Sequence, residues 1–175
     1  MRKKLSIYIH IPFCVKKCVY CDFLSFGADD PQINRSGAVR KAYVQSICRE
    51  LLSYKSISKD YIVKTIFIGG GTPSILLPGE IMNILATLRS IFFVDDAAEI
   101  TIEVNPGPLT VLKAAAYPAA GINRIIIRLQ SAHNDDLPLL GRIHHSELFL
   151  TSHHTAFAAS FSHIVDHLIS AVLGP

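Results

Sequence analysis

Apolar and polar positions along this chain follow two periods that alternate from one end to the other. Short runs rich in β-branched residues predict strands, and longer segments with apolar residues three and four positions apart predict helices. The expected strands cover residues 5–11, 64–68, 99–104, 122–129 and 163–170, and the expected helices cover 37–54, 80–92, 108–116, 135–140 and 146–159. Strands that alternate with helices predict βα units and a parallel sheet.

The first strand shows a strict period of two, which indicates that its two faces meet different surroundings. One face carries Leu5, Ile7, Ile9 and Ile11, and the other carries Ser6, Tyr8 and His10. We expect the apolar face to pack under helices and the polar face to line a site. An ordinary half-exposed strand is the alternative. Pro108 suits the first turn of the helix expected over 108–116.

Composition indicates a globular protein with one core. Half of the 175 residues are apolar and 18% are charged. The net charge of +3 comes without a basic block, so we expect no nucleic-acid partner. No apolar run reaches the roughly 18 residues that span a membrane, and the polar interruptions of the first strand argue against a signal peptide.

Three cysteines directly after the first strand are the main chemical signal. Cys14, Cys18 and Cys21 are spaced C-x3-C-x2-C. Three thiolates can hold three irons of a [4Fe–4S] cluster and leave the fourth iron open to a small molecule. A zinc site, which usually has four protein ligands, and unligated or disulfide-bonded cysteines are the alternatives. Clustered thiols without an export signal predict the cytoplasm.

A glycine triplet follows the second expected strand. Residues Gly69, Gly70 and Gly71 precede Thr72, and backbone without side chains lets a ligand approach the main chain closely. A tight turn from strand to helix would need the same residues. Cys48 lies apart from the cysteine motif, on the apolar face of its helix, so we expect it to be a small core residue.

Together these motifs resemble a known family. YIHIPFC with CVYCDF, IFIGGGTPS, EITIEVNPG, GINR with LQS, and LLGRIH are similar to the radical S-adenosylmethionine (SAM) proteins of the heme chaperone and oxygen-independent coproporphyrinogen oxidase group. The resemblance runs from Ser6 to His144. It implies an α/β fold, a partial (βα) radical SAM barrel that is incomplete at the C-terminus. Residues 1–175 would form the N-terminal, cluster- and SAM-binding part of the core domain, without the family's C-terminal domain.

The resemblance also implies a set of site residues. Cys14, Cys18 and Cys21 would ligate the [4Fe–4S] cluster, whose electron cleaves SAM to a 5′-deoxyadenosyl radical in the family. The residues expected to contact SAM are Tyr8, Tyr20, Gly70, Gly71, Thr72, Glu103, Gln130 and Arg142. Glu103 would accept hydrogen bonds from a ribose or an amine, and the guanidinium of Arg142 is suited to the SAM carboxylate.

Two positions depart from the family pattern. The family has a glycine where this chain has Arg128, and strand alternation directs Arg128 into the same cavity as Gln130. We expect its bulk and charge to impair binding of the cationic SAM. An aspartate that holds SAM in the family aligns with His167 without a gap and with Asp166 after a one-residue slip. Six of the eight histidines lie beyond Ile143, where sequence drift explains them better than a metal site does.

Three functions fit this sequence. The first is a heme chaperone-like protein of porphyrin and heme metabolism, which Asp22-Phe23 after the third cysteine favours. The second is an oxygen-independent coproporphyrinogen III oxidase, which forms protoporphyrinogen IX. The third is a non-catalytic, cluster-binding remnant. Expected partners are an electron donor for the cluster and heme or porphyrin, bound weakly or not at all because the C-terminal domain is not part of this sequence.

Overall fold

The computed structural model describes residues 2–28, 30 and 37–170. Its strands are β1 (Lys3–Ile11), β2 (Tyr61–Gly70), β3 (Phe93–Val104), β4 (Arg124–Gln130) and β5 (His163–Leu168). Its helices are α1 (Ala38–Ser53), α2 (Lys55–Ser58), the 3-10 turn η1 (Pro73–Ile75), α3 (Pro78–Ile91), α4 (Val111–Ala119), α5 (Asp136–Leu139) and α6 (Ser146–Ala158).

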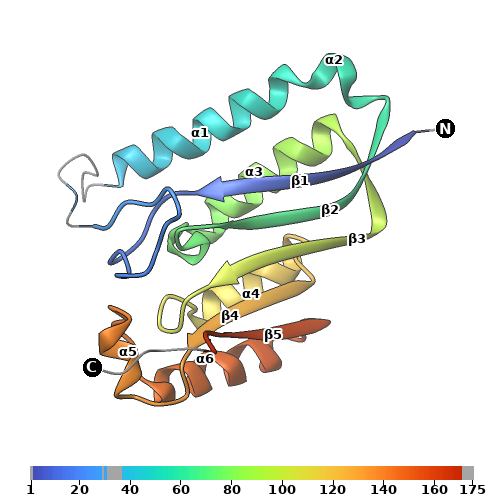
Figure 1. The fold of residues 1–175 in the computed structure, drawn as a ribbon. Helices are drawn as coiled ribbons and strands as arrows, with labels where there is room; N and C mark the ends of the chain where they lie inside the picture. The colour runs from blue at the N-terminus through green and yellow to red at the C-terminus, as the bar shows by residue number, and fades with distance from the viewer. Residues whose placement is uncertain (1, 29, 31–36, 171–175) are drawn as a thin grey trace.

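The strands form one parallel sheet in the order β1-β2-β3-β4-β5. Each strand pairs with the next strand in sequence, as in a barrel that has been left open. Among the described residues, β1 and β5 are the two edges of this sheet. The carboxyl ends of all strands point to the same side, where the loop after β1 and helix α5 also lie (Figure 1). The predicted α/β fold with a parallel sheet is therefore confirmed.

The helices cover one face of the curved sheet (Figure 1). Helix α1 contacts α3, α3 contacts α4, and α4 contacts α6, so neighbouring helices form one layer. The core lies between this layer and the sheet, and alternate strand residues fill it, among them Ile9, Ile11, Ile66, Ile68, Ile100, Ile102, Ile125 and Ile127. Burying each such side chain contributes about 1.5–3 kcal/mol.

The predicted elements are found with shifted ends, and one helix begins later than expected. We expected Pro108 in the first helical turn, but α4 begins at Val111. The hydroxyl of Thr110 accepts a hydrogen bond from the backbone N–H of Lys113 at 3.3 Å and caps the helix there. Pro108 instead belongs to the turn that follows β3. Helix α2 was not predicted.

The face of the sheet opposite the helices carries polar and aromatic side chains. Ile7, Ile9 and Ile11 of β1 pack on or into the core, whereas Tyr8 is 54% exposed. Glu103 on β3 and Arg128 on β4 contact each other on this face, which we call the inner face of the sheet. The two-faced pattern predicted for the first strand is therefore confirmed and continues across the sheet.

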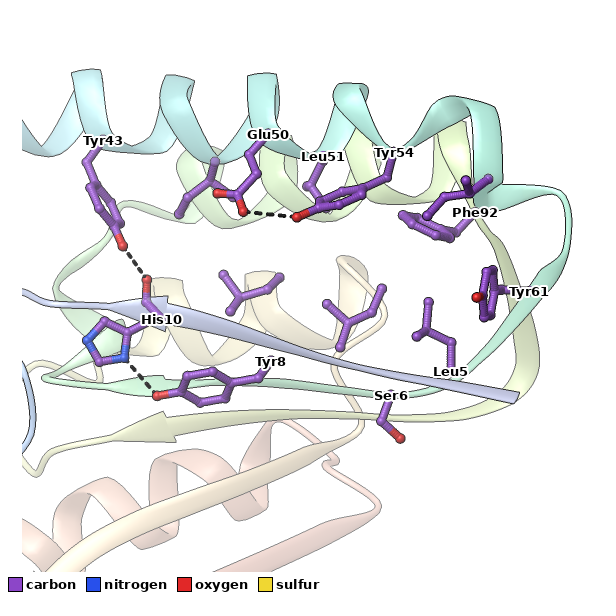
Figure 2. A pocket seen from close by; sticks show the side chains of 14 residues that line it. Leu5, Ser6, Tyr8, His10, Tyr43, Glu50, Leu51, Tyr54, Tyr61 and Phe92 are labelled. Atoms are coloured by element: carbon purple, nitrogen blue, oxygen red, sulfur yellow. Dashed lines mark hydrogen bonds between the residues drawn. The ribbon is translucent and has the colours of Figure 1, made fainter. Parts of the chain in front are cut away.

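A hollow of about 520 Å³ lies beside the β1 edge, under α1. Its walls include Ile47, Leu51, Tyr54, Tyr61 and Phe92. Figure 2 shows Tyr43 reaching from α1 to β1, where its hydroxyl donates to the backbone carbonyl of His10 at 2.9 Å. Tyr8 and His10 extend to the other side of β1 and hydrogen-bond each other at 2.9 Å (Figure 2).

His144, between α5 and α6, joins the helical layer to the sheet. It is 3% exposed, and its Nε2–H donates to the carbonyl oxygen of Leu129 in β4 at 3.1 Å. Burial, followed by the positive charge of Arg142, lowers the pKa of His144 to about 4 from 6.5. The folded chain therefore keeps this imidazole neutral under conditions in which the unfolded chain protonates it.

We predict that the free energy of unfolding falls as the pH drops from about 6.5 towards 4. In this window the unfolded state binds a proton that His144 in the folded state does not, so acid favours unfolding. Denaturant titrations at several pH values measure the slope. His144→Gln should reduce it, whereas the same change at the exposed His154 should not. Equal slopes for the wild type and His144→Gln would show that His144 does not cause the pH dependence.

Candidate functional site

The cysteine loop, residues 12–28, is fixed to the carboxyl ends of β1 and β2. Its two ends pair with each other through the backbone N–H of Cys14 and the carbonyl of Phe26, at 2.9 Å. The backbone of the glycine loop crosses close by, because Gly71 N–H donates to Ile11 O at 2.8 Å and Thr72 N–H donates to Phe13 O at 2.7 Å. A Cβ at Gly71 would lie 2.7 Å from Phe13 O and 3.0 Å from Cys14 Sγ. Only glycine permits this approach.

The three cysteines of the motif line one cavity of about 390 Å³. The residues that line it are Cys14, Lys16, Cys18, Tyr20, Cys21, Asp22, Phe23, Gly71, Thr72, Glu103, Asn105, Arg128, Gln130, Arg142 and His167. All four cysteines of the chain are free thiols, and Cys48 lies away from the cavity, where it accepts a hydrogen bond from Asn83 of α3. In the part of the chain that the structure describes, no three metal-binding side chains are gathered around a single-ion position.

A chain of hydrogen bonds connects two of the cysteines across the cavity. The hydroxyl of Thr72 donates to Cys14 Sγ at 3.6 Å and accepts from Asn105 Nδ2 at 2.9 Å. Asn105 Oδ1 in turn accepts from Arg142 at 3.1 Å, and Arg142 also donates to Cys18 Sγ at 3.5 Å. Asn105 was not predicted as a site residue. Its position directly after the third strand was the signal that could have found it, because strand ends meet at the site.

Burial dominates the protonation behaviour of the cavity. Burial raises the pKa of the Cys14 thiol, and hydrogen bonds from Thr72 and Ser25 oppose this shift. Burial and the negative charge of Cys18 raise the pKa of Tyr20 to about 12, so its hydroxyl remains a hydrogen-bond donor at neutral pH.

Arg128 crosses the cavity from β4 to the glycine loop. Its guanidinium forms an ion pair with Glu103 and donates to the carbonyl oxygens of Gly71, at 3.2 Å, and Gly70, at 3.5 Å. The side chains of Arg128 and Glu103 are only 13% and 14% exposed. Arg128 and Gln130 both line the cavity, as strand alternation predicted. A bulge separates them, and Gln130 adopts a left-handed conformation with φ 72°.

Most of the residues expected to contact SAM come together at this cavity. Tyr20, Gly71, Thr72, Glu103, Gln130 and Arg142 line it. Gly70 does not line it but directs its carbonyl at Arg128. Tyr8 lies beside it on the inner face of the sheet, stacked on Phe67 with ring centroids 6.1 Å apart. The roles assigned to these residues stay predictions.

The structure separates His167 from Asp166. His167 lines the cavity, whereas Asp166 lies 3.8 Å from His153 Nε2 on α6. Of these two residues, His167 is therefore the one at the cavity, and its correspondence to the family's aspartate stays a prediction. His153 and His154 lie next to each other on α6, but no group of three side chains with metal-binding geometry is gathered there among the described residues.

The cavity fits a cluster better than it fits SAM. Three free cysteines on one loop line the same space, and cysteine thiolates are the ligands that hold iron–sulfur clusters. Three buried polar atoms without a partner belong to lining residues, namely Arg128 Nε, Gln130 Oε1 and Arg142 Nε, and they offer contacts to a polar ligand. The carboxylate of Glu103, however, is already paired with Arg128.

Comparisons with known proteins identify the family of the chain. Residues 8–175 match the Radical SAM superfamily. The chain is 41% identical over 140 residues to the heme chaperone HemW of Escherichia coli, covering 80% of this chain and 35% of that protein. It is 34% identical over 176 residues to the HemW of Lactococcus lactis, covering 99% of this chain and 43% of that protein. The chain therefore spans less than half the length of these relatives.

A solved structure shows the same fold. Coproporphyrinogen III oxidase (HemN) from Escherichia coli, described as a radical SAM enzyme, superimposes with a TM-score of 0.87 at 26% identity. The match covers 98% of this chain and 38% of that one, so the five-stranded sheet corresponds to part of a larger protein. With the family match over nearly its whole length, the chain belongs to the radical SAM superfamily.

Proposed function

We propose that this chain is the cluster- and SAM-binding part of a heme chaperone-like radical SAM protein. The observation that carries the proposal is the cavity onto which Cys14, Cys18 and Cys21 all open. Identity of 41% to a heme chaperone supports the assignment within the superfamily. Coproporphyrinogen III oxidase is the second candidate, supported by the structural likeness to HemN.

In this proposal the three cysteines hold a [4Fe–4S] cluster, and residues around them fix its surroundings. Bound together, cluster and SAM supply the one-electron chemistry of the superfamily. Arg142 places a positive charge beside Cys18, and Thr72 orients Cys14 through a hydrogen bond. Gln130 Oε1 offers a free acceptor to a ligand in the cavity. Phe23, which lines the cavity, is more than half exposed and offers an apolar surface there.

The proposed partners are an electron donor for the cluster and heme or porphyrin. The clustered thiols support a reducing compartment, and we propose the cytoplasm. No helix in the described part of the chain has the length and hydropathy to cross a membrane.

Cluster binding is tested by anaerobic reconstitution with iron and sulfide. We predict close to four irons per chain, measured by iron analysis and absorbance. Cys14→Ala should abolish cluster formation, because only two of the three thiolates would remain to hold the cluster. Cys48→Ala is the matched control, since Cys48 lies away from the cavity, and it should retain the full iron content. Loss of iron in Cys48→Ala would show that the ligand assignment is wrong.

A glycine pair tests whether the backbone approach at Gly71 positions the cysteine loop. Gly71→Ala should lower the iron content, because the added methyl group would push against Phe13 O and Cys14 Sγ. Gly79→Ala should leave the iron content unchanged, because a Cβ there meets open space. Iron analysis after identical reconstitution compares the two variants. Equal iron content in both would mean that the close approach does not set the position of Cys14.

Hemin titration tests the heme partner. We predict weak or absent binding to the 175-residue chain, because it spans only 35–43% of the heme chaperones that it matches. The Soret band measures binding. Saturable, stoichiometric binding at low micromolar hemin would contradict this prediction and would direct attention to the late histidines as axial ligands.

A further inference from the structure

Arg128 occupies hydrogen-bond acceptors on one wall of the cavity. Its side chain starts on β4, passes over β3 and reaches the loop that follows β2, three neighbouring parts of the sheet in Figure 1. One guanidinium thus binds the Glu103 carboxylate and two successive backbone carbonyls, those of Gly70 and Gly71. A planar group with five N–H donors is well suited to hold several acceptors at once.

A ligand with an ammonium group and ribose hydroxyls needs acceptors of this kind. A buried ammonium that finds no acceptor costs more than a hydrogen bond gains. Of the other polar lining groups, Asn105 Oδ1 is engaged by Arg142, whereas Gln130 Oε1 is without a partner. A ligand bound on this wall must therefore displace Arg128 or go without its acceptors.

We infer that the side chain of Arg128 fills part of this cavity. Its guanidinium binds the hydrogen-bond acceptors that the ammonium and ribose of SAM would use. This inference rests on the proposed function, in which the cavity is the SAM site. Arg128 then determines ligand affinity in this chain. Binding of SAM requires the ion pair with Glu103 to open, so affinity is lowered although every cysteine is in place.

The ion pair between Arg128 and Glu103 changes the expected cause of impaired SAM binding. From sequence alone, the bulk of Arg128 and repulsion between its guanidinium and the sulfonium of SAM were both expected. In the structure the Glu103 carboxylate lies against that guanidinium, so a nearby sulfonium meets a nearly neutral pair. Occupied acceptors and side-chain bulk, rather than like charge, are what remains to oppose binding.

Two ligands separate these mechanisms. SAM and S-adenosylhomocysteine share the ammonium, the carboxylate and the ribose, but only SAM carries the sulfonium. If Arg128 acts by occupying acceptors, its removal improves binding of both ligands equally. If it acts by repulsion, only SAM gains. Calorimetric titration of the reconstituted chain under anaerobic conditions measures both affinities without any activity assay.

We predict that Arg128→Met and Arg128→Gly tighten binding of both ligands on the order of 10- to 100-fold. Arg128→Met keeps most of the side-chain bulk but removes the donors, so a gain in this variant reports freed acceptors rather than freed space. Arg124→Met is the matched control. Arg124 lies on the same face of β4 and pairs with Glu99 on β3, at 3.4 Å, outside the cavity. It should change neither affinity.

Removing Arg128 leaves the Glu103 carboxylate buried without its cation, so thermal unfolding is measured for each variant. Arg128→Lys retains a cation for Glu103 but lacks the fork that reaches both carbonyls, and it should give a smaller gain with native stability. If Arg128→Gly and Arg128→Met do not fold, the comparison of ligand affinity between Arg128→Lys and the wild type tests the inference.

The outcomes are distinct. Wild-type binding at micromolar affinity, unchanged in the variants, overturns the role of Arg128 and leaves the proposed SAM site standing. A gain confined to SAM overturns occupancy in favour of repulsion. A gain in Arg128→Gly without one in Arg128→Met also overturns occupancy, because bulk would then be the cause. If folded Arg128 variants with a full cluster bind neither ligand, the proposed SAM site itself is wrong.

Discussion

The close approach of two backbones at Gly71 is the constraint on which the site depends. Two hydrogen bonds, from Gly71 to Ile11 and from Thr72 to Phe13, join the loops that follow β1 and β2. Because Gly71 has no side chain, Cys14 Sγ can lie where a Cβ would otherwise come within 3.0 Å. The chain of contacts from Thr72 through Asn105 to Arg142 and Cys18 then spans the cavity. Loosening the backbone contact at Gly71 would therefore also disturb the hydrogen bonds that run from Thr72 to Cys18.

Periodicity predicted most of the fold because burial enforces it. The alternation of β1 and the isoleucines of β3 and β4 follow directly from one face against helices and one face against a cavity. Helix ends were harder to predict, because local capping decides them. Pro108 suits a first turn, but the hydroxyl of Thr110 satisfies a backbone N–H and sets the start of α4. Such competition between two nearby start signals depends on the turn that precedes the helix.

The candidate site was predictable as a set of residues but not as a set of contacts. Strand alternation placed Arg128 and Gln130 in the same cavity, and the structure agrees. Alternation says nothing about partners on neighbouring strands, so the ion pair with Glu103 and the compensation of charge that follows from it were not foreseen. Asn105 was not predicted because its hydrogen-bond partners lie on other loops, whose positions at the strand ends cannot be derived from the sequence around Asn105.

The two edges of the sheet are protected against further strand pairing to different degrees. An edge strand exposes unpaired N–H and C=O groups, and charged side chains usually discourage another strand from adding there. Two lysines, Lys3 and Lys4, open β1, whereas the exposed polar residues of β5 are His163, Asp166 and His167. The β1 edge therefore presents two neighbouring cations to an incoming strand, whereas β5 presents a single carboxylate, which makes β5 the less protected of the two edges.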